Sequence, residues 1–333
     1  MARNATNKLL NKAKSDKNDE FYTILADIER ELTHYVKHFK KKTVFCNCDD
    51  PRKSNFFHYF SYNFAELGLK KLITTCYKNQ DADLFSRHKV ERAIYLEYTG
   101  DEGGNVPKYK DKDIKQLKGD GDFRSQECIE LLKQSDIVVT NPPFSLFREY
   151  VSQLAAHKKK FLIVGSWNVI TYIEVFKLIK ENKLWIGVNS NRNFSGFIVP
   201  EHYPLSGTEA RMENGQRVIS TNTTCWFTNI DNKKRHEDLI LFKNYNRKDY
   251  PKYDNYDAIE VSKTADIPID YDGVMGVPVT FLDRYNPEQF EILGCNRGVD
   301  QDPNGVYGRG SYLNGKETFK RLFIRNKNPE RPK

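Results

Sequence analysis

The sequence of 333 residues lacks any apolar run long enough to cross a lipid bilayer, which takes about 20 residues. The residues after Met1 are polar and basic, without the apolar core of a secretory signal, so we expect a cytoplasmic protein with no membrane attachment. The six cysteines are scattered, and none forms a Cys-x-x-Cys pair or a Cys/His cluster with zinc-ligand spacing. We therefore expect reduced thiols and no bound metal.

A glycine-rich loop is also missing where α/β proteins often place one. Residues 43–48 form a short apolar run that predicts the first strand. A Gly-x-Gly turn commonly follows such a strand, because it lets the backbone approach a nucleotide. Here the strand runs into Cys46-Asn47-Cys48-Asp49-Asp50-Pro51 instead. Carboxylates in this place predict a site that accepts hydrogen bonds from ribose hydroxyls or an ammonium group; a capped strand-to-helix turn is the alternative.

The sequence has fewer acidic than basic residues, with 45 Asp and Glu against 53 Lys and Arg, which gives a formal net charge of +8. Net charge bears on association rather than on fold, so this excess favours a polyanionic partner. Residues 1–18 are basic and form either a solvated tail or an arm that contacts phosphates. A second basic stretch lies among tyrosines and suits either DNA contacts or a solvated, loop-rich subdomain; its candidates are Lys233, Lys234, Arg235, Lys243, Arg247 and Lys248.

The strongest motif follows residues 136–140, an apolar, β-branched run that predicts a buried strand. Asn141-Pro142-Pro143-Phe144 ends this strand in a rigid loop, at the edge where open α/β sheets place their sites. Two consecutive prolines remove two backbone N–H donors, so the loop presents acceptors. The Asn141 side-chain oxygen, the Pro142 carbonyl and the ring of Phe144 together suit a flat heterocycle with an exocyclic amino group.

Asn141-Pro142-Pro143-Phe144 resembles the catalytic motif of amino-methyltransferases that use S-adenosylmethionine, above all DNA adenine-N6 methyltransferases. Relatives with Asn-Pro-Pro-Tyr also modify guanine in RNA or glutamine in proteins, so the motif indicates a chemistry before a substrate. Two further segments, Asp19-Glu20-Phe21-Tyr22-Thr23 and Asn47-Cys48-Asp49-Asp50-Pro51, make the chain similar to the EcoRI-type adenine-specific DNA modification methyltransferases. The resemblance covers nearly the whole chain.

This resemblance implies S-adenosylmethionine as the cofactor and indicates which residues bind it. Gly119-Asp120-Gly121-Asp122-Phe123 lies shortly before Asn141, at a distance of 19 residues from Asp122 (141 − 122). In the order of motifs typical of these methyltransferases, a carboxylate at this position accepts a hydrogen bond from the adenine amine of the cofactor. The resemblance implies that Asp122 is this carboxylate and that Phe123 packs on the adenine. A simple Gly/Asp turn is the alternative. The complete expected set is Phe21, Tyr22, Thr23, Asn47, Cys48, Asp49, Asp50, Asp122 and Phe123.

Alternating strands and helices predict an α/β fold, with a mostly parallel, Rossmann-like sheet and helices on both faces. Strands are expected at 43–48, 70–76, 93–96, 136–140, 159–164, 184–188, 224–228, 276–282 and 319–325, and helices at 24–35, 54–67, 125–133, 145–154 and 171–182. Asn214-Gly215 predicts a type I′ hairpin turn. We expect a flexible arm at 1–18, a methyltransferase catalytic domain at 19–230 and a smaller target-recognition region at 231–333.

The expected function is site-specific DNA adenine-N6 methylation by a monomer acting on double-stranded DNA, as the modification half of a type II restriction-modification system paired with an endonuclease. An RNA base methyltransferase is one alternative, and the long basic C-terminal part favours DNA over it. A catalytically inactive DNA-binding protein is another, and the intact Asn141, Pro142 and Phe144 count against it. No Pro-Cys dipeptide occurs, so the nucleophile motif of cytosine-C5 methyltransferases is absent.

Overall fold

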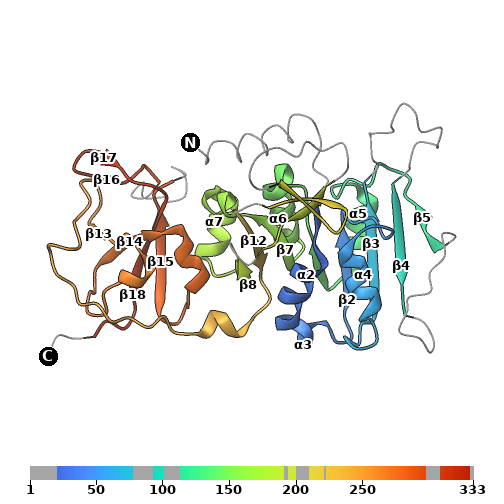
Figure 1. Cartoon of the computed structure of the whole chain (residues 1–333), viewed down its shortest axis with the longest axis horizontal. Coiled ribbons are helices and arrows are strands. Elements are labelled where there is room, and N and C mark those ends of the chain that lie inside the picture. Colours follow the sequence, from blue (N-terminus) through green and yellow to red (C-terminus); the bar gives the residue numbers. More distant parts are fainter. Residues whose placement is uncertain are drawn as a thin grey trace. The chain divides into compact units, whose positions relative to one another are not determined.

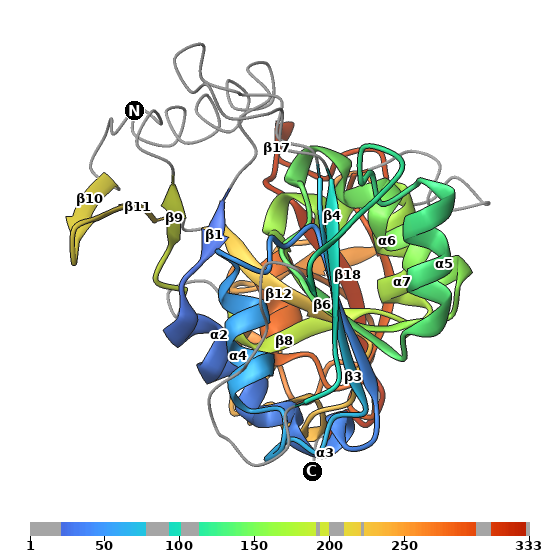
Figure 2. The same cartoon turned by 90° about the vertical axis from the view of Figure 1, so that its right-hand side faces the viewer.

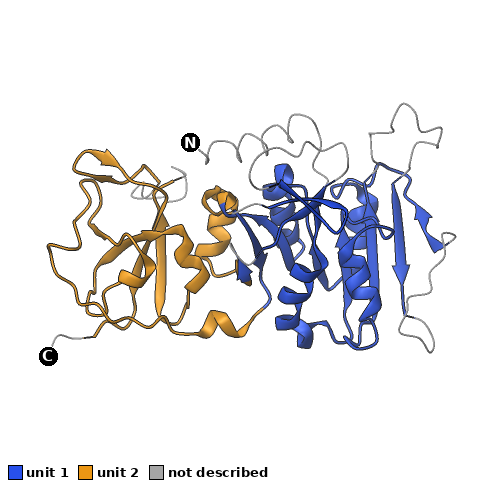
Figure 3. Ribbon diagram, viewed as in Figure 1, with its two compact units in different colours: residues 1–167, 189–230 blue, residues 168–188, 231–333 orange. Residues whose placement is uncertain are grey.

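The computed structural model of the chain describes residues 21–77, 93–100, 113–190, 194–199, 210–220, 223–297 and 308–330. Its residues group into two compact units (Figure 3). Unit 1 comprises 1–167 and 189–230, and unit 2 comprises 168–188 and 231–333. The expected division at residue 230 differs from these units in one segment, because 168–188 groups with the C-terminal residues. The expected arm at 1–18 lies outside the described residues.

Unit 1 contains an eight-stranded sheet with the order β5-β4-β3-β2-β6-β7-β12-β8 (Figure 1). The chain returns from unit 2 to unit 1 within β8. The strands are β2 (Thr43–Asn47), β3 (Lys71–Cys76), β4 (Ile94–Tyr98), β5 (Lys115–Gln116), β6 (Ile137–Thr140), β7 (Lys160–Ser166), β8 (Trp185–Ser190) and β12 (Thr224–Thr228).

The sheet is mixed rather than mostly parallel. Its central strands β3, β2, β6 and β7 run parallel. Strand β4 pairs antiparallel with β3, β5 with β4, and β12 with β7. Every residue of β2 and β6 is buried, as is typical of parallel strands covered on both faces, whereas β4 alternates between buried and half-buried residues as antiparallel strands do.

Helices cover both faces of this sheet (Figure 2). On one face lie α2 (Leu25–Leu32) and α4 (Asn55–Tyr62), and on the other α5 (Gln126–Gln134) and α6 (Phe147–Ala156). The short helix α3 (Val36–Phe39) follows α2. Helix α4 begins where the Ser54 side chain accepts hydrogen bonds from the backbone nitrogens of Phe56 and Phe57, an N-cap that satisfies two otherwise unpaired donors.

A second sheet in unit 1 has the order β1-β9-β11-β10, with antiparallel pairs throughout. Its strands are β1 (Tyr22–Thr23), β9 (Phe197–Val199), β10 (Ala210–Glu213) and β11 (Gln216–Ile219). Asn214 and Gly215 connect β10 to β11 with φ values of 50° and 75°, as a type I′ turn requires, so this predicted hairpin is confirmed. Strand β1 places Thr23 opposite Phe197.

Unit 2 combines α7 (Ile173–Lys180) with a four-stranded sheet of the order β13-β14-β18-β15. These strands are β13 (Ala258–Glu260), β14 (Val274–Pro278), β15 (Phe290–Cys295) and β18 (Arg321–Asn326), and a small hairpin is formed by β16 (Tyr312–Leu313) and β17 (Lys316–Glu317). The strand predicted at 276–282 stops at Pro278 and continues as a 3₁₀ turn, because proline cannot extend the hydrogen-bond ladder.

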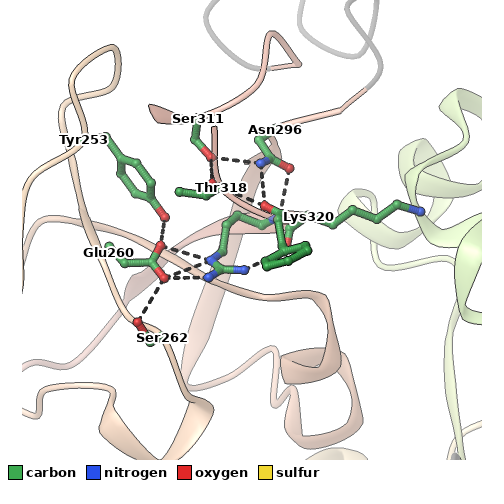
Figure 4. A network of polar contacts seen from close by, with 9 residues as sticks. Tyr253, Glu260, Ser262, Asn296, Ser311, Thr318 and Lys320 are labelled. Carbon is green, nitrogen blue, oxygen red and sulfur yellow. Dashed lines mark hydrogen bonds and ion pairs between the residues drawn. The ribbon is translucent and has the colours of Figure 1, made fainter. Parts of the chain in front are cut away.

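A buried polar network anchors the start of β18 (Figure 4). The Arg321 guanidinium donates to both carboxylate oxygens of Glu260, at 2.6 to 3.1 Å, and the Tyr253 hydroxyl donates to the same carboxylate. Asn296 is fully buried; its Oδ1 accepts from the Arg321 backbone nitrogen, and its Nδ2 donates to Ser311 Oγ. Because each group has a partner, the cost of burying it is offset.

The sequence predicted no metal site, no membrane-spanning helix and reduced thiols. Within the ranges that the structure describes, no group of three or more His, Cys, Asp or Glu side chains could hold a metal ion. In the same ranges no helix has the length and apolar character needed to span a membrane. All six cysteines are free, and four of them are buried.

Candidate active site

The carboxyl ends of β2 and β6 lie where the strand order reverses, since β3 is on one side of β2 and β6 on the other. In open α/β sheets ligands bind outside the carboxyl ends of strands at such a reversal. The ladder between β2 and β6 ends at the pair Phe45 and Val138, two residues before each strand ends. The ladder between β2 and β3 continues to Asn47, opposite Thr75. Backbone pairing between β2 and β6 therefore stops short of the site.

Asn141 directly follows β6, and its amide has a defined orientation. Its Nδ2 donates to the Phe21 carbonyl oxygen at 2.6 Å. A carbonyl can only accept, so the amide nitrogen must face Phe21, and Oδ1 is directed elsewhere. This Oδ1 is buried and has no hydrogen-bond partner among the described residues. Leaving a buried acceptor unsatisfied costs about 1–3 kcal/mol, so the orientation suits a donor supplied from outside the protein.

Three aromatic rings, Phe21, Phe144 and Phe197, form a cluster beside Asn141. Phe144 stacks on Phe21 with ring centroids 6.0 Å apart and an interplanar angle of 26°. The Phe197 ring meets Phe144 nearly edge-on, at 5.8 Å and 71°. Pro142 is buried and Pro143 half-buried, and the Pro143 carbonyl accepts from the Leu146 nitrogen to start a 3₁₀ turn. The proposed catalytic tetrapeptide is thus held between this turn and the aromatic cluster.

Cys48 replaces the glycine that is missing after the first strand. It adopts a φ of 69°, a left-handed conformation that glycine usually supplies and that costs other residues about 1–3 kcal/mol. Burial, followed by the nearby Asp49, raises the pKa of the Cys48 thiol, and Cys76 and Asp122 contribute in the same direction. The thiol is therefore neutral, and the groups that influence it come from three different segments around the site.

Asp49 is directed into the protein rather than toward a ligand. Its Oδ1 accepts from Ser54 Oγ at 2.7 Å, and its Oδ2 lies 2.6 Å from Thr140 Oγ1. Burial raises the pKa of this carboxyl to about 7, although its hydrogen bonds with Thr140 and Ser54 oppose that shift. Each oxygen of Asp49 already has one partner within the protein, and a contact of Asp49 with the cofactor stays a prediction.

Asn47 and Asp50 also take part in contacts within the chain. Asn47 Oδ1 accepts from Thr75 Oγ1 at 2.7 Å. Asp50 Oδ1 accepts from the backbone nitrogen and the Nε of Arg52, at 2.9 and 3.2 Å. Both contacts of Asp50 use one oxygen, so Oδ2 takes no hydrogen bond from the described residues. Of the two carboxylates in this loop, Asp50 has the acceptor that remains available.

The loop that carries Asp122 packs closely against the end of β3. Gly121 has a φ of 80°, and a Cβ added there would lie 2.6 Å from the Cys76 carbonyl oxygen. Only glycine allows this approach without strain. The charge of Asp122 contributes to the raised pKa of the Cys48 thiol, so the loop of Asp122 lies near the loop of Cys48 that follows β2. The two segments expected to bind the cofactor are therefore brought together.

Asp122 is ion-paired, whereas Phe123 is buried. The Asp122 carboxylate accepts from Arg124 Nε at 2.9 Å and Nη2 at 2.7 Å, and this hydrogen bonding lowers its pKa. The Phe123 ring packs edge-on against Tyr150 of α6, with centroids 4.9 Å apart. Asp122 is thus an ionised carboxylate at the site, and Phe123 contributes to the core beneath it.

The segment from Phe21 to Thr23 is held against the site from two sides. Phe21 O accepts from Asn141, and the Thr23 carbonyl accepts from Asn55 Nδ2 of α4 at 2.8 Å. Thr23 Oγ1 is buried and has no hydrogen-bond partner in the part of the chain that the structure describes. Like Asn141 Oδ1, this hydroxyl is a buried polar atom that a bound molecule can satisfy. Tyr22, in the same strand, is half-buried.

Some contributors to the site were not predicted. Ser54 precedes an aromatic helix and carried the sequence signal of an N-cap, but its bond to Asp49 could not be inferred. Thr140 was expected to be an ordinary strand residue, and its partner Asp49 lies 91 positions earlier in the chain. Phe197 and Asn55 carried no signal, because their contacts with the site come from strand pairing and from a helix end.

Three of the six basic residues expected to contact DNA are used inside unit 2. Lys234 Nζ lies 2.7 Å from the Asp283 carboxylate and 2.8 Å from the Val188 carbonyl oxygen. The Arg235 guanidinium lies 3.7 Å from the centroid of the Trp185 ring. Lys243 pairs with Asp266 at 2.7 Å. Lys234 and Arg235 are half-buried in these contacts, whereas Lys243 is exposed, and contact of the three with DNA stays a prediction.

The other three, Lys233, Arg247 and Lys248, are exposed, and none forms an ion pair with the described residues. The tyrosines among them have a different role. Tyr250, Tyr253 and Tyr256 are all less than 10% exposed. They pack in the core of unit 2, which favours structural packing over contacts with a nucleic-acid groove.

Comparisons with known proteins agree with one another. A family model described as adenine-specific methyltransferase EcoRI matches residues 9–329. The Type II methyltransferase M.EcoRI of Escherichia coli is 56% identical over 330 residues, which cover 98% of this chain and 99% of the relative. M.MgeORF184P of Mycoplasma genitalium is 43% identical over 293 residues (86% and 85%), and M.MpnI of Mycoplasma pneumoniae 38% over 330 residues (95% and 98%). No solved structure matches.

Proposed function

Because the chain belongs to the EcoRI family of adenine-specific methyltransferases, we propose how the site in unit 1 performs the reaction. The enzyme is an adenine-specific DNA methyltransferase of the type II restriction-modification class. We propose that it methylates N6 of an adenine within a short site in double-stranded DNA, inside the cell. The observation that carries this proposal is the buried, unpartnered Oδ1 of Asn141.

We propose that S-adenosylmethionine binds at the carboxyl ends of β2 and β3, next to Asn141, in a Rossmann-like arrangement. When bound, it supplies a methyl group attached to a positively charged sulfonium. The reversal of strand order at β2 supports this position. The unpartnered hydroxyl of Thr23, the available oxygen of Asp50 and the ionised Asp122 are polar groups of the kind that a nucleoside with an ammonium group requires.

Asn141 and Pro142 act on the amine of the target base. The lone pair of adenine N6 is delocalised into the ring, which makes the amine a poor nucleophile. By accepting the two amine hydrogens, Asn141 Oδ1 and the Pro142 carbonyl favour a pyramidal nitrogen with a localised lone pair. These acceptors are oriented before the base arrives, since the Phe21 carbonyl fixes the Asn141 amide. The acceleration then comes from orientation and from stabilising the developing positive charge.

Phe144 receives the base. The N6 atom cannot be reached inside a stacked duplex, so the adenine must leave the helix, at a cost of a few kcal/mol. The half-buried Phe144 ring already stacks with Phe21 and contacts Phe197, which makes this corner a surface for planar aromatic groups. We propose that the flipped adenine packs on Phe144 with its amine directed to Asn141.

We propose unit 2 as the region that binds the target sequence, with Lys233, Arg247 and Lys248 contacting phosphates. Two observations support this assignment. The formal net charge is +8, and these three side chains are exposed without ion pairs among the described residues. Phosphate contacts of this kind position the duplex without reading its sequence.

Mapping N6-methyladenine in DNA from cells that express the full chain tests the proposed function. We expect methylation at every copy of one short sequence, and its loss in Asn141→Ala. Asn63→Ala is the matched control, because Asn63 is also half-buried and its Nδ2 also donates to a backbone carbonyl, in a helix cap outside the site. Methylation of RNA alone, or full methylation by Asn141→Ala, would contradict the proposal.

A further inference from the structure

The carboxyl ends of β2 and β6 are joined by a chain of hydroxyl and carboxyl groups. Thr140 Oγ1 lies 2.6 Å from Asp49 Oδ2 and within hydrogen-bond distance of the Asn47 carbonyl oxygen. A threonine hydroxyl has one hydrogen, and a carbonyl has none. If the Asp49 carboxyl were ionised, Thr140 would have one hydrogen for two contacts. One pair of oxygens would then face each other without a hydrogen between them.

Ser54 cannot supply the second hydrogen. Its Oγ already accepts from the backbone nitrogens of Phe56 and Phe57, so its own hydrogen is the one that reaches Asp49 Oδ1, at 2.7 Å. The remaining source is Asp49 itself. A protonated Asp49 donates from Oδ2 to Thr140 Oγ1, and Thr140 donates to the Asn47 carbonyl. Each contact in the series from Ser54 through Asp49 and Thr140 to Asn47 then contains one hydrogen.

The surroundings of Asp49 favour its neutral form. The neighbouring Asp50 carboxylate, the thiols of Cys46 and Cys48, and the phenol of Tyr150 in α6 all interact with it electrostatically, and each is neutral or negative. Asp49 is also buried, and burial is the main reason that its pKa rises to about 7. The hydrogen count and the surroundings of Asp49 therefore both favour a protonated carboxyl.

We propose that Asp49 is a positioning residue, which carries a proton in the assembled site and fixes Asn141 through Thr140. The backbone ladder between β2 and β6 ends two residues before this point, so the chain from Asp49 through Thr140 to Asn47 joins the two strand ends beyond it. Thr140 immediately precedes Asn141. Loss of the proton breaks one contact and separates the strand ends, and a displacement of about 1 Å at a reacting group can slow a reaction about 10²-fold.

The pH dependence of Asp49→Asn tests this inference, which rests on the proposed role of Asn141. An asparagine reproduces the neutral carboxyl, since its Nδ2 can donate to Thr140 and its Oδ1 can accept from Ser54. With saturating DNA and S-adenosylmethionine, we expect kcat of the unmodified enzyme to fall as pH rises above the Asp49 pKa, by up to tenfold per pH unit. We expect Asp49→Asn to lack this decline while its affinity for S-adenosylmethionine stays similar.

Two results would overturn the inference. If Asp49→Asn retained the alkaline decline, another group would be responsible for it. If it lost affinity for S-adenosylmethionine at every pH, Asp49 would be an ionised acceptor for the cofactor. Thr140→Ser and Thr140→Val give an independent comparison, because only the serine keeps the hydroxyl. We expect Thr140→Ser to retain kcat and Thr140→Val to lose at least tenfold, and equal kcat values for the two would also reject the chain of contacts.

A measurement without catalysis separates this inference from the proposed function. Carboxyl ¹³C resonances of aspartate-labelled, full-length protein can be followed across pH without cofactor or DNA, and the Asp49 signal identified by its absence in Asp49→Asn. We expect this signal to keep the shift of a protonated carboxyl at pH 6. An ionised carboxyl at pH 6 would refute the inference even if the enzyme methylates DNA. A protonated one would support it even if no methylation were found.

Discussion

The loops that follow β2 and β6 start from neighbouring strands, but their polar groups are used in opposite ways. After β2, both oxygens of Asp49 and the Oδ1 of Asn47 are occupied by hydroxyl groups of the protein. After β6, the Asn141 amide is fixed through its nitrogen while its oxygen stays buried and unpartnered. The polar groups of the first loop therefore stabilise the fold, whereas the acceptor in the second is available to a bound molecule.

This difference shows that a polar residue at the carboxyl edge of a sheet is not in itself a ligand. What separates Asn141 from Asp49 is which hydrogen-bonding groups remain after the protein's own partners are counted. Substitutions should accordingly differ in how strongly each reduces methylation and stability.

The largest effect is expected for Asn141→Ala. Removing one preoriented group that stabilises a transition state costs about 10²–10³ in kcat, or about 2.7–4 kcal/mol. The fold should lose little, because the Asn141 side chain makes one hydrogen bond with the described residues, to the Phe21 carbonyl. Single-turnover methylation and calorimetry with S-adenosylmethionine measure the two quantities. An equal loss of cofactor affinity would show that Asn141 belongs with the structural acceptors.

Asp49→Ala should mainly reduce stability and, through Thr140, should also reduce kcat. It leaves the buried Ser54 hydroxyl without its acceptor and removes one of the two contacts of Thr140, at about 1–3 kcal/mol for a stranded group. Urea unfolding should show this loss in the free energy of unfolding. Asp50→Ala is the control, because its contacts are with the partly exposed Arg52 and should contribute about 1 kcal/mol or less. Equal losses for the two variants would remove the distinction between these carboxylates.

The stability of the protein should also depend on pH through Asp49. Its pKa rises from 3.8 to about 7 on folding, so the folded state binds more protons than the unfolded state between those values. This contribution is fully present below about pH 4 and is lost as pH rises toward 7, at up to about 1.4 kcal/mol per pH unit. Subtracting the unfolding curve of Asp49→Asn isolates it. A difference that does not change with pH would mean that Asp49 is ionised in the folded protein.

Asp122→Ala should have a smaller effect, on the cofactor alone. Its carboxylate is partly exposed and already paired with Arg124, so solvent and the guanidinium weaken what it can contribute. We expect affinity for S-adenosylmethionine to fall by about 1–2 kcal/mol in calorimetry, the lower part of the range for losing a hydrogen bond to a charged group. Arg124→Gln is the matched variant, because it frees the carboxylate. If Asp122→Ala binds the cofactor normally, residues 119–123 are only a turn.

The smallest effect per residue is expected in unit 2. Neutralising Lys233, Arg247 and Lys248 together should weaken binding to cognate and random duplexes alike. The slope of log affinity against log salt should fall by about 0.9 for each lost phosphate contact. Lys183→Ala, a change at an exposed lysine paired with Glu181, is the control. An unchanged slope in the triple variant would mean that these side chains form a solvated surface.

Sequence reasoning located the central elements well because their signals are local. The apolar runs at 43–48 and 136–140 became β2 and β6, and Asn214-Gly215 became the predicted turn. The tetrapeptide after β6 was identified because consecutive prolines restrict the backbone whatever surrounds them. These features depend on residues that are neighbours in the chain.

The features that the sequence did not predict concern relations between distant residues. Asp49 lies in a loop whose composition suggests ligand binding, but its Oδ2 contacts Thr140, which is 91 positions away in the chain. The antiparallel flanks of the sheet depend on how strands pair, which apolar runs do not reveal. The sequence also does not show that Asp283 lies beside Lys234 and Trp185 beside Arg235, two basic residues predicted to contact DNA.

The interleaving of the two units has a consequence for biosynthesis. Residues 168–188 emerge from the ribosome before unit 1 is complete, yet they belong to unit 2, where α7 packs against β15 (Figure 1). The residues of β15 begin 110 positions after the end of α7 (290 − 180). Protein synthesis adds about 5–20 residues per second, so β15 begins to be made about 5–20 s after α7 is finished. The buried residues of α7 are Val175, Phe176 and Ile179. Until β15 is synthesised, α7 lacks this contact of the folded unit, which makes the helix a candidate target for a chaperone that binds apolar segments.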